Sequence, residues 1–112
     1  MPRYAARVDA NHAEIVKALR DVGCSVESLA SIGHDLPDLL VGHHGETYLL
    51  EVKDGAKPPS RRRVTPGQKR WHALWRGRRV DTVINIDEAY RAVGIRLSQR
   101  GFVSAPGPKG GT

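Results

Sequence analysis

Residues 37–53 read PDLLVGHHGETYLLEVK, and this stretch decides the fold. It holds two apolar runs, 38–43 and 47–53, which are separated by the turn sequence His44-Gly45-Glu46. Apolar runs of strand length on either side of a glycine-containing turn are typical of a β-hairpin. We therefore predict two antiparallel strands that lie side by side in a sheet.

Three ionisable residues lie at the open end of this predicted hairpin. Asp38 begins the first strand, and Glu51 and Lys53 end the second. Side chains alternate between the two faces of a strand, so Glu51 and Lys53 are expected on one face and Leu50 on the other. In an antiparallel pair the start of one strand lies beside the end of the next. Asp38, Glu51 and Lys53 are therefore predicted to converge.

Two carboxylates beside a lysine suit a particular chemistry. The carboxylates form a hard oxygen site for Mg²⁺ or Mn²⁺, with water and a substrate phosphate completing the coordination shell. Such a metal lowers the pKa of a bound water and stabilises charge on the phosphate, while the lysine orients both. The alternative is structural: Glu51 and Lys53 form an exposed ion pair, and Asp38 caps a turn after Pro37. The hairpin spacing of the two motifs favours the metal site.

At these residues the chain resembles the PD-(D/E)XK phosphodiesterase superfamily, with Pro37-Asp38 and Glu51-Val52-Lys53 as the motif. Within that superfamily it is similar to the small stand-alone virus-type replication-repair nuclease (VRR-NUC) domains of phages and bacteria. The similarity extends over residues 10–90, and its further positions are Glu14, Gly33, Leu39, Leu40, Thr65, Pro66, Gln68 and Trp71.

The resemblance implies an α/β fold with a restriction-endonuclease-like core, which is a small mixed β-sheet flanked by helices. The implied catalytic residues are Asp38, Glu51, Lys53, Gln68 and Glu14. The implied metal ligands are Asp38, Glu51 and the backbone carbonyl of Val52, with Glu14 as a further candidate. Members of this small type tend to be homodimers that cut branched DNA, including four-way (Holliday) junctions. A homodimer and a branched DNA substrate are therefore implied as well.

The charge of the chain indicates a polyanionic partner. Its 112 residues include 18 Lys and Arg against 12 Asp and Glu, which gives a net charge of +6 and a pI near 10.0. Residues 54–79 are strongly basic and contain Asp54 as their single acid. A solvated face is the usual structural role of such a run, but its position beside the predicted site favours contacts with phosphates. The predicted DNA-binding residues are Lys57, Arg61, Arg62, Arg63, Lys69 and Arg70.

Periodicity and turn signals predict further elements around the hairpin. In chain order they are a helix over 11–22, a strand over 24–30, a loop over 31–37, a basic loop over 54–64, a helix from Pro66 to a stop at Gly77, a strand over 80–86 and a helix over 87–97 capped by Asp87. The helical connection makes the 80–86 strand parallel to the strand that carries Glu51. Residues 98–112 are predicted to be a disordered tail, which leaves 1–97 as a single nuclease domain.

Two of the implied site residues have a structural alternative. Glu14 lies three residues after Asn11 and would complete a capping box if Asn11 begins the first helix. Gln68 lies three residues after Thr65 and has the same alternative at the start of the second helix. In the second case one side chain can serve both the cap and the site.

One face of the second predicted helix carries Gln68, Trp71, His72 and Trp75 at helical spacing. The two tryptophans are expected to pack inward on the sheet. Gln68 then also faces inward, within reach of a phosphate or of Lys53. On this packed face His72 is expected to be a core histidine rather than a general base.

Several classes of site and location are excluded by the sequence. The single cysteine, Cys24, cannot form an intrachain disulfide and is expected to be a small buried side chain. No cysteine or histidine spacing resembles a zinc motif. No stretch approaches about 18 apolar residues, so neither a membrane span nor a signal peptide is expected. We therefore expect a cytoplasmic protein, phage-encoded or bacterial, without a membrane partner or a small-molecule cofactor.

These features together predict an Mg²⁺- or Mn²⁺-dependent DNA endonuclease that hydrolyses phosphodiester bonds in branched DNA. The alternatives are a flap or nicking nuclease, and a non-catalytic nucleic-acid-binding module that keeps the nuclease fold. The presence of Asp38, Glu51 and Lys53 together favours the enzyme, because carboxylates repel phosphates and a pure binder gains nothing from gathering them.

Overall fold

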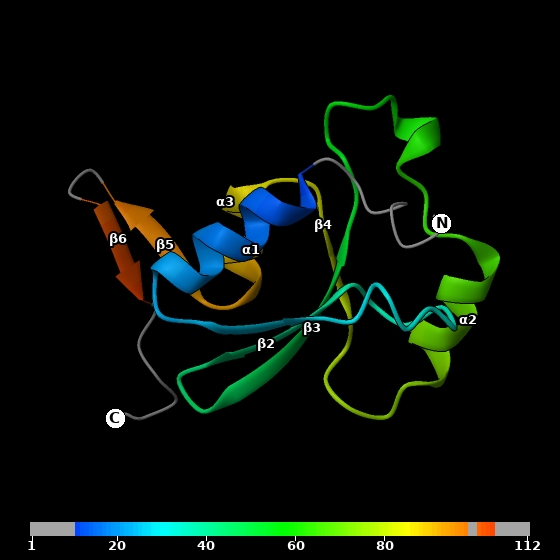
Figure 1. Cartoon of the computed structure of the whole chain (residues 1–112), viewed down its shortest axis with the longest axis horizontal. Coiled ribbons are helices and arrows are strands. Elements are labelled where there is room, and N and C mark those ends of the chain that lie inside the picture. The colour runs from blue at the N-terminus through cyan, green and yellow to red at the C-terminus, as the bar shows by residue number, and fades with distance from the viewer. Residues whose placement is uncertain (1–10, 99–100, 105–112) are drawn as a thin grey trace.

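The fold is a mixed α/β arrangement with one four-stranded sheet (Figure 1). The computed structural model describes residues 11–98 and 101–104. In chain order these residues form α1 (His12–Asp21), β1 (Ser25–Ser28), β2 (Leu39–His43), β3 (Glu46–Val52), the 3₁₀ helix η2 (Pro59–Arg61), α2 (Pro66–Leu74), β4 (Asp81–Val83), α3 (Ile86–Ala92), β5 (Ile95–Ser98) and β6 (Gly101–Ser104). The predicted α/β class with a small mixed sheet is confirmed. Among the described residues, no helix has the length and apolar character needed to cross a membrane.

The sheet has the strand order β1-β2-β3-β4. The first two pairings are antiparallel and the β3–β4 pairing is parallel, as predicted. His43 pairs with Glu46, so the hairpin closes through the two residues His44 and Gly45, whose φ angles are 49° and 80°. Positive φ at both positions matches a type I′ turn, in which glycine suits the second position. The predicted hairpin is confirmed, with a turn one residue shorter than expected.

The buried core lies on one face of the sheet. Leu39 and Leu50 are fully buried there and face Ile15 and Leu19 of α1 and Val93 after α3. Helix α1 contacts α3, and Figure 1 shows the two helices side by side over this face. Each fully buried aliphatic side chain contributes roughly 1.5–3 kcal/mol relative to exposure. This apolar contact fixes the sheet and leaves Glu51 on its other face, together with Leu40 and Leu49.

Asn11 joins the start of α1 to the ends of two strands. Its Nδ2 donates to the carbonyl oxygen of Lys53 over 3.1 Å and to that of Ile84 over 2.9 Å. Asn11 is the first residue before α1, but its side chain does not cap the helix. The capping box considered for Asn11 and Glu14 is therefore not formed. The side chain instead holds α1 beside the strand end that carries Glu51.

Helix α2 lies on the opposite face of the sheet, and all its residues remain partly or fully exposed. The two tryptophans face the sheet, as predicted, but they do not pack closely on it: Trp75 is 44% exposed, and the indole of Trp71 stacks on it with 4.9 Å between ring centroids. The helix ends at Leu74, earlier than the predicted stop at Gly77, because Trp75 adopts an extended backbone. The helix has no apolar stripe wide enough to close a second core, since Leu74 is 71% exposed.

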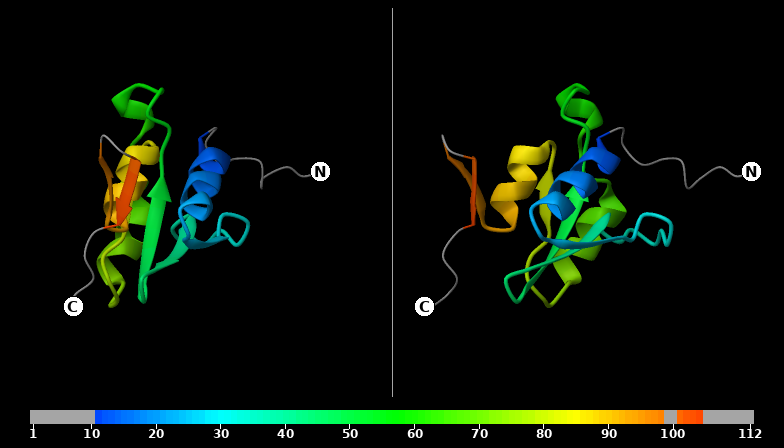
Figure 2. Two further views of the ribbon diagram at one scale, coloured as in Figure 1. Left: turned by 90° about the vertical axis from the view of Figure 1, so that its left-hand side faces the viewer. Right: turned by 60° about the vertical axis from the view of Figure 1, so that its left-hand side comes forward.

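The C-terminal part differs from the prediction. Helix α3 begins after Asn85, whose Oδ1 accepts from the Glu88 N–H over 2.8 Å, so Asn85 and not Asp87 is the cap. Gly94, at φ 84°, follows the helix, and β5 and β6 form an antiparallel hairpin next to α3 (Figure 2). The predicted helix over 87–97 is confirmed as far as Ala92, but its last residues belong to β5. Ser98 and Gly101–Ser104, which were predicted to be disordered, lie in strands. Residues 99–100 and 105–112 of the predicted tail lie outside the described residues.

Candidate functional site

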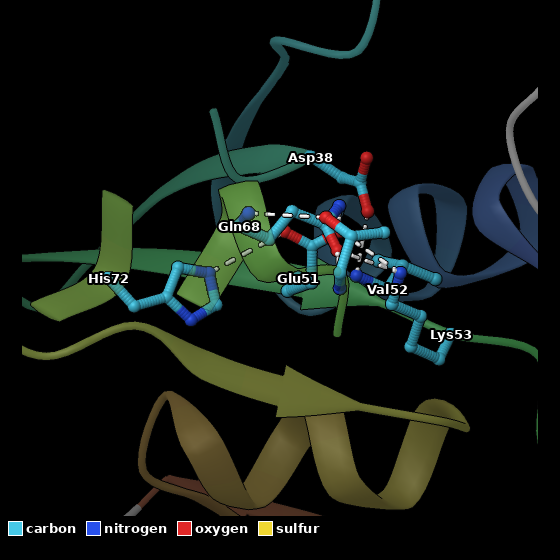
Figure 3. A network of polar contacts seen from close by, with 7 residues as sticks. Asp38, Glu51, Val52, Lys53, Gln68 and His72 are labelled. Carbon is cyan, nitrogen blue, oxygen red and sulfur yellow. Dashed lines mark hydrogen bonds and ion pairs between the residues drawn. The ribbon is translucent and has the colours of Figure 1, made fainter. Parts of the chain in front are cut away.

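Asp38 stands at the open end of the β2–β3 hairpin (Figure 3). Leu39 pairs with Leu50, so the register continued by one residue places Asp38 across from Glu51. Its Oδ2 accepts a hydrogen bond from the backbone N–H of Val52 over 2.8 Å. This bond satisfies an N–H at the strand end and also holds the carboxylate beside Glu51. Asp38 thus has a structural role that is compatible with a chemical one.

Glu51 is a buried carboxylate on the face of β3 opposite to the apolar core. Its residue exposure is only 1%, although Leu50 and Val52 on either side of it face the core. Its Oε2 accepts from Gln68 Nε2 over 3.0 Å and lies 3.8 Å from Lys53 Nζ. A buried carboxylate is costly unless it is paired and hydrogen-bonded. Here Lys53, which the strand spacing predicted to lie beside Glu51, supplies the opposite charge, and Gln68 supplies the hydrogen bond.

Gln68 connects the site to the start of α2. Its Oε1 accepts from Lys53 Nζ over 3.2 Å and from the Thr65 N–H over 2.9 Å. Its own N–H donates to Thr65 Oγ1 over 3.2 Å, which completes a capping box. The prediction that Gln68 serves both the helix cap and a contact with Lys53 is confirmed. The first turn of α2 is consequently fixed in position relative to β3.

His72 lies one helical turn after Gln68 and contacts the same carboxylate (Figure 3). Its Nε2 is 3.7 Å from Glu51 Oε1. Burial lowers the pKa of His72 below its ordinary value, and the nearby Lys53 ammonium lowers it further. The imidazole is therefore mainly neutral at pH 7. We expected a core histidine; its contact with Glu51 was missed, although its spacing four residues after Gln68 placed both on one helix face.

The oxygen donors at this end of the hairpin suit a hard divalent cation. The N–H of Val52 points toward Asp38, and the carbonyl of a strand residue points to the same side as its N–H. The Val52 carbonyl is thus directed to the side of β3 on which Asp38 lies. Mg²⁺ and Mn²⁺ prefer such ligands. The hydrogen bonds that the two carboxylates accept use part of their lone-pair capacity.

Glu14 is not gathered into this group. It is exposed on α1, and in the described part of the chain no cluster of three or more His, Cys, Asp or Glu side chains forms a metal site. The two carboxylate residues that the register sets across from each other are therefore Asp38 and Glu51. The role implied for Glu14 as an accessory residue or metal ligand stays a prediction.

The predicted DNA-binding residues lie on exposed segments that follow β3. Lys57, Arg61 and Arg63 are exposed around η2, and Lys69 and Arg70 are exposed on α2. Arg62 is half-buried, and its Nε donates to the Lys57 carbonyl over 2.8 Å. That bond and η2 give the basic loop a defined backbone path. These guanidinium and ammonium groups lie at the surface, where a polyanion can approach them.

Comparison with known protein families, with curated proteins and with solved structures finds no match to this chain. What can be said of its function therefore depends on the geometry of the site.

Proposed function

We propose that this protein is an Mg²⁺- or Mn²⁺-dependent DNA endonuclease of the PD-(D/E)XK type, built on a restriction-endonuclease-like core. The observation that carries the proposal is the buried carboxylate of Glu51, held between Gln68 and Lys53 and placed across from Asp38. A strand-end ion pair in a purely structural role would normally be exposed, since burying charges costs free energy. Active sites are places where this cost is accepted.

In this proposal each residue has one role. Asp38, Glu51 and the Val52 carbonyl would hold the cation, which when bound supplies Lewis-acid stabilisation and a water of lowered pKa. Lys53 holds the scissile phosphate and orients the attacking water. Gln68 is a positioning residue, because its amide fixes the separation of Glu51 and Lys53.

The proposed substrate is DNA, supported by the net charge of +6 and by the exposed basic residues after β3. Branched DNA and a homodimer are proposed from the family resemblance. A two-fold dimer would supply two matched sites for two nicks in a four-way junction. A monomer would fit a flap or nicking nuclease better.

A second candidate function is a non-catalytic nucleic-acid-binding module. The pairing of Glu51 with Lys53 favours it, because this contact neutralises part of the negative charge that would repel a phosphate. In that case the Glu51, Lys53 and Gln68 contacts serve only to dock α2.

Incubation of the chain with labelled duplex, flap and four-way-junction DNA in Mg²⁺, Mn²⁺ or EDTA separates these functions. Metal-dependent cleavage by the wild type, with none by Asp38→Asn, is expected for the nuclease. Salt-dependent binding of the same DNAs without cleavage in any metal would support the binding module instead. Cleavage of flap DNA alone would select the flap nuclease.

A further inference from the structure

An open apolar groove of about 400 Å³ lies between α2 and the sheet face that carries Glu51. Leu40 and Leu49, paired across β2 and β3, line it together with the indoles of Trp71 and Trp75. Leu29 and Leu36, which precede β2, complete its apolar lining. The groove is thus mainly apolar and aromatic.

The groove adjoins the candidate site. Leu49 lies two residues before Glu51 on the same face of β3, which places their Cα atoms about 7 Å apart. On α2, Trp71 follows Gln68 by three residues, less than one turn of the helix. The same strand and the same helix therefore border both the groove and the Glu51–Lys53 contact. A linear molecule bound at the site can continue into the groove.

The groove also presents surface that a ligand would cover favourably. Trp75 is 44% exposed and Leu40 is 37% exposed, and each Å² of apolar area removed from water contributes roughly 25 cal/mol. Arg78 also lines the groove and is half-exposed; its guanidinium lies 4.6 Å from the centroid of the Tyr48 ring and 3.7 Å from Glu46 Oε1. Arg78 thus brings a cation to the lining of an otherwise apolar groove, and the exposed Glu46 carboxylate neutralises it only in part. That combination complements an aromatic ligand attached to an anion.

We propose that the groove binds an unpaired nucleobase of the DNA strand whose phosphate lies at Asp38, Glu51 and Lys53. Aromatic side chains stack on bases with little sequence preference, at about 1–3 kcal/mol per base. A base enters such a pocket most easily where it is already unpaired, since extruding it from a duplex costs a few kcal/mol. The inference rests on the proposed nuclease function. It specifies the substrate as DNA with unpaired nucleotides beside the scissile phosphate.

The test uses the fluorescence of the protein itself, because the chain has two tryptophans and both line the groove. The full chain in EDTA is titrated with oligothymidylate of about 12 nucleotides, a length typical of single-strand sites. An abasic deoxyribose-phosphate chain of the same length and a hairpin duplex are titrated in parallel. We expect saturable quenching by oligothymidylate and none by the abasic chain. Equal quenching by the abasic chain, or binding of oligothymidylate without quenching, would overturn the proposal.

Two variants localise the effect. Trp75→Ala should weaken oligothymidylate binding by about 5- to 150-fold, the loss of one stacking contact, and leave duplex binding unchanged. Leu74→Ala is the matched control, because Leu74 is the exposed neighbour of Trp75 and does not line the groove. Equal losses in both variants would contradict a base site. A wild-type dimer that Trp75→Ala converts to a monomer, without quenching by DNA, would assign the groove to a second copy of the chain.

Because binding is measured without metal, the two proposals fail separately. If the protein cleaves junction DNA but oligothymidylate does not quench its tryptophans, the base-binding proposal is overturned and the proposed nuclease function stands. If oligothymidylate quenches the tryptophans but the protein cleaves no DNA in Mg²⁺ or Mn²⁺, base binding in the groove is upheld. The nuclease function, and with it the placement of a scissile phosphate beside the groove, is then overturned.

Discussion

Gln68 Nε2 donates to Glu51 Oε2 across 3.0 Å, which fastens the first turn of α2 to the end of β3. The oxygen of the same amide accepts from Lys53 Nζ and from the Thr65 N–H. One side chain therefore joins a helix cap to a buried charge pair. A change at Gln68 acts on the helix and on the site at once, and the two effects can be separated.

Gln68→Ala should lower the rate of cleavage far more than Thr65→Ala does, although both variants lose the cap of α2. Loss of the cap costs about 0.5–2 kcal/mol of unfolding free energy in Gln68→Ala and in Thr65→Ala, and loss of the bond to the buried Glu51 carboxylate adds about 1.5–3 kcal/mol in Gln68→Ala alone. Only Gln68→Ala also releases Glu51 and Lys53 from their common partner. Urea unfolding and single-turnover cleavage of both variants give the comparison. Equal losses of activity in the two variants would reduce Gln68 to a helix cap.

Asp38→Asn should abolish cleavage and keep the fold. Asn retains an oxygen that can accept from the Val52 N–H, so this contact survives while the negative charge is lost. Asp38→Ala removes both and leaves that N–H without its acceptor, at a cost of about 1–3 kcal/mol. DNA binding should be unchanged or tighter in both variants, because a charge that repels phosphate is gone. Full activity of Asp38→Asn would exclude Asp38 as a metal ligand.

The hairpin and the register that sets Asp38 across from Glu51 could be predicted because they depend on local signals. A period of two in 47–53 and a glycine turn set the strand faces and the register. The double role of Gln68 was also visible, since Thr65 and Gln68 form a capping box in any helix that begins there. These features require no knowledge of where other elements lie.

The features that the sequence did not predict are of two kinds. Some depend on how elements distant in the sequence pack together, and others depend on a choice between neighbouring residues with equal local preference. The contact of His72 with Glu51 and the bonds of Asn11 to two strand ends exist only once α2 and α1 are placed on the sheet. Asn85 and Asp87 are both good caps, and the sequence does not rank them. The strands after Gly94 have four residues each, too short for a periodic signal.

Asn11→Asp should destabilise the protein more than Asn11→Ala. Asn11 is buried and donates to the Lys53 and Ile84 carbonyls. Alanine removes these two bonds at about 0.5–1.5 kcal/mol each. Aspartate has no N–H to donate and places a negative charge against two carbonyl oxygens. Denaturant unfolding of both variants measures the two losses of stability. An Asn11→Asp variant as stable as the wild type would show that the two hydrogen bonds of Asn11 contribute little to stability.

Acidification should destabilise the protein partly through His72. Its folded pKa is below the unfolded value of about 6.5, so the unfolded chain binds the proton more readily. The stability contributed by neutral His72 is complete above that pH and is lost as the pH falls through the folded pKa. His72→Gln should therefore lose less stability than the wild type between about pH 7.5 and pH 5.5. Part of the dependence should remain, because burial and His44 also lower the pKa of His43. Identical pH profiles would contradict the assignment.

Metal binding should be visible as thermal stabilisation without any DNA. Mn²⁺ at about ten times its dissociation constant raises the unfolding free energy by about 1.4 kcal/mol, which corresponds to several degrees in Tm. Glu51→Gln should lose this increase, whereas Asp21→Asn should keep it, because Asp21 is an exposed carboxylate paired with Lys17 on α1. Scanning calorimetry with Mn²⁺ and with EDTA measures both. The same increase in Glu51→Gln would place the metal elsewhere.

Lys53→Ala should differ from Glu51→Gln in its response to Mn²⁺. Lys53 Nζ lies 3.8 Å from Glu51 Oε2 and competes with a cation for that carboxylate. Its removal should preserve or increase the Mn²⁺-dependent rise in Tm, while cleavage is lost because the phosphate and the attacking water are no longer oriented. If Lys53→Ala loses both the Tm rise and cleavage, Lys53 serves to hold the fold of the site and has no separate part in chemistry. If it keeps cleavage, the proposed catalytic lysine is wrong, although the metal ligands stand.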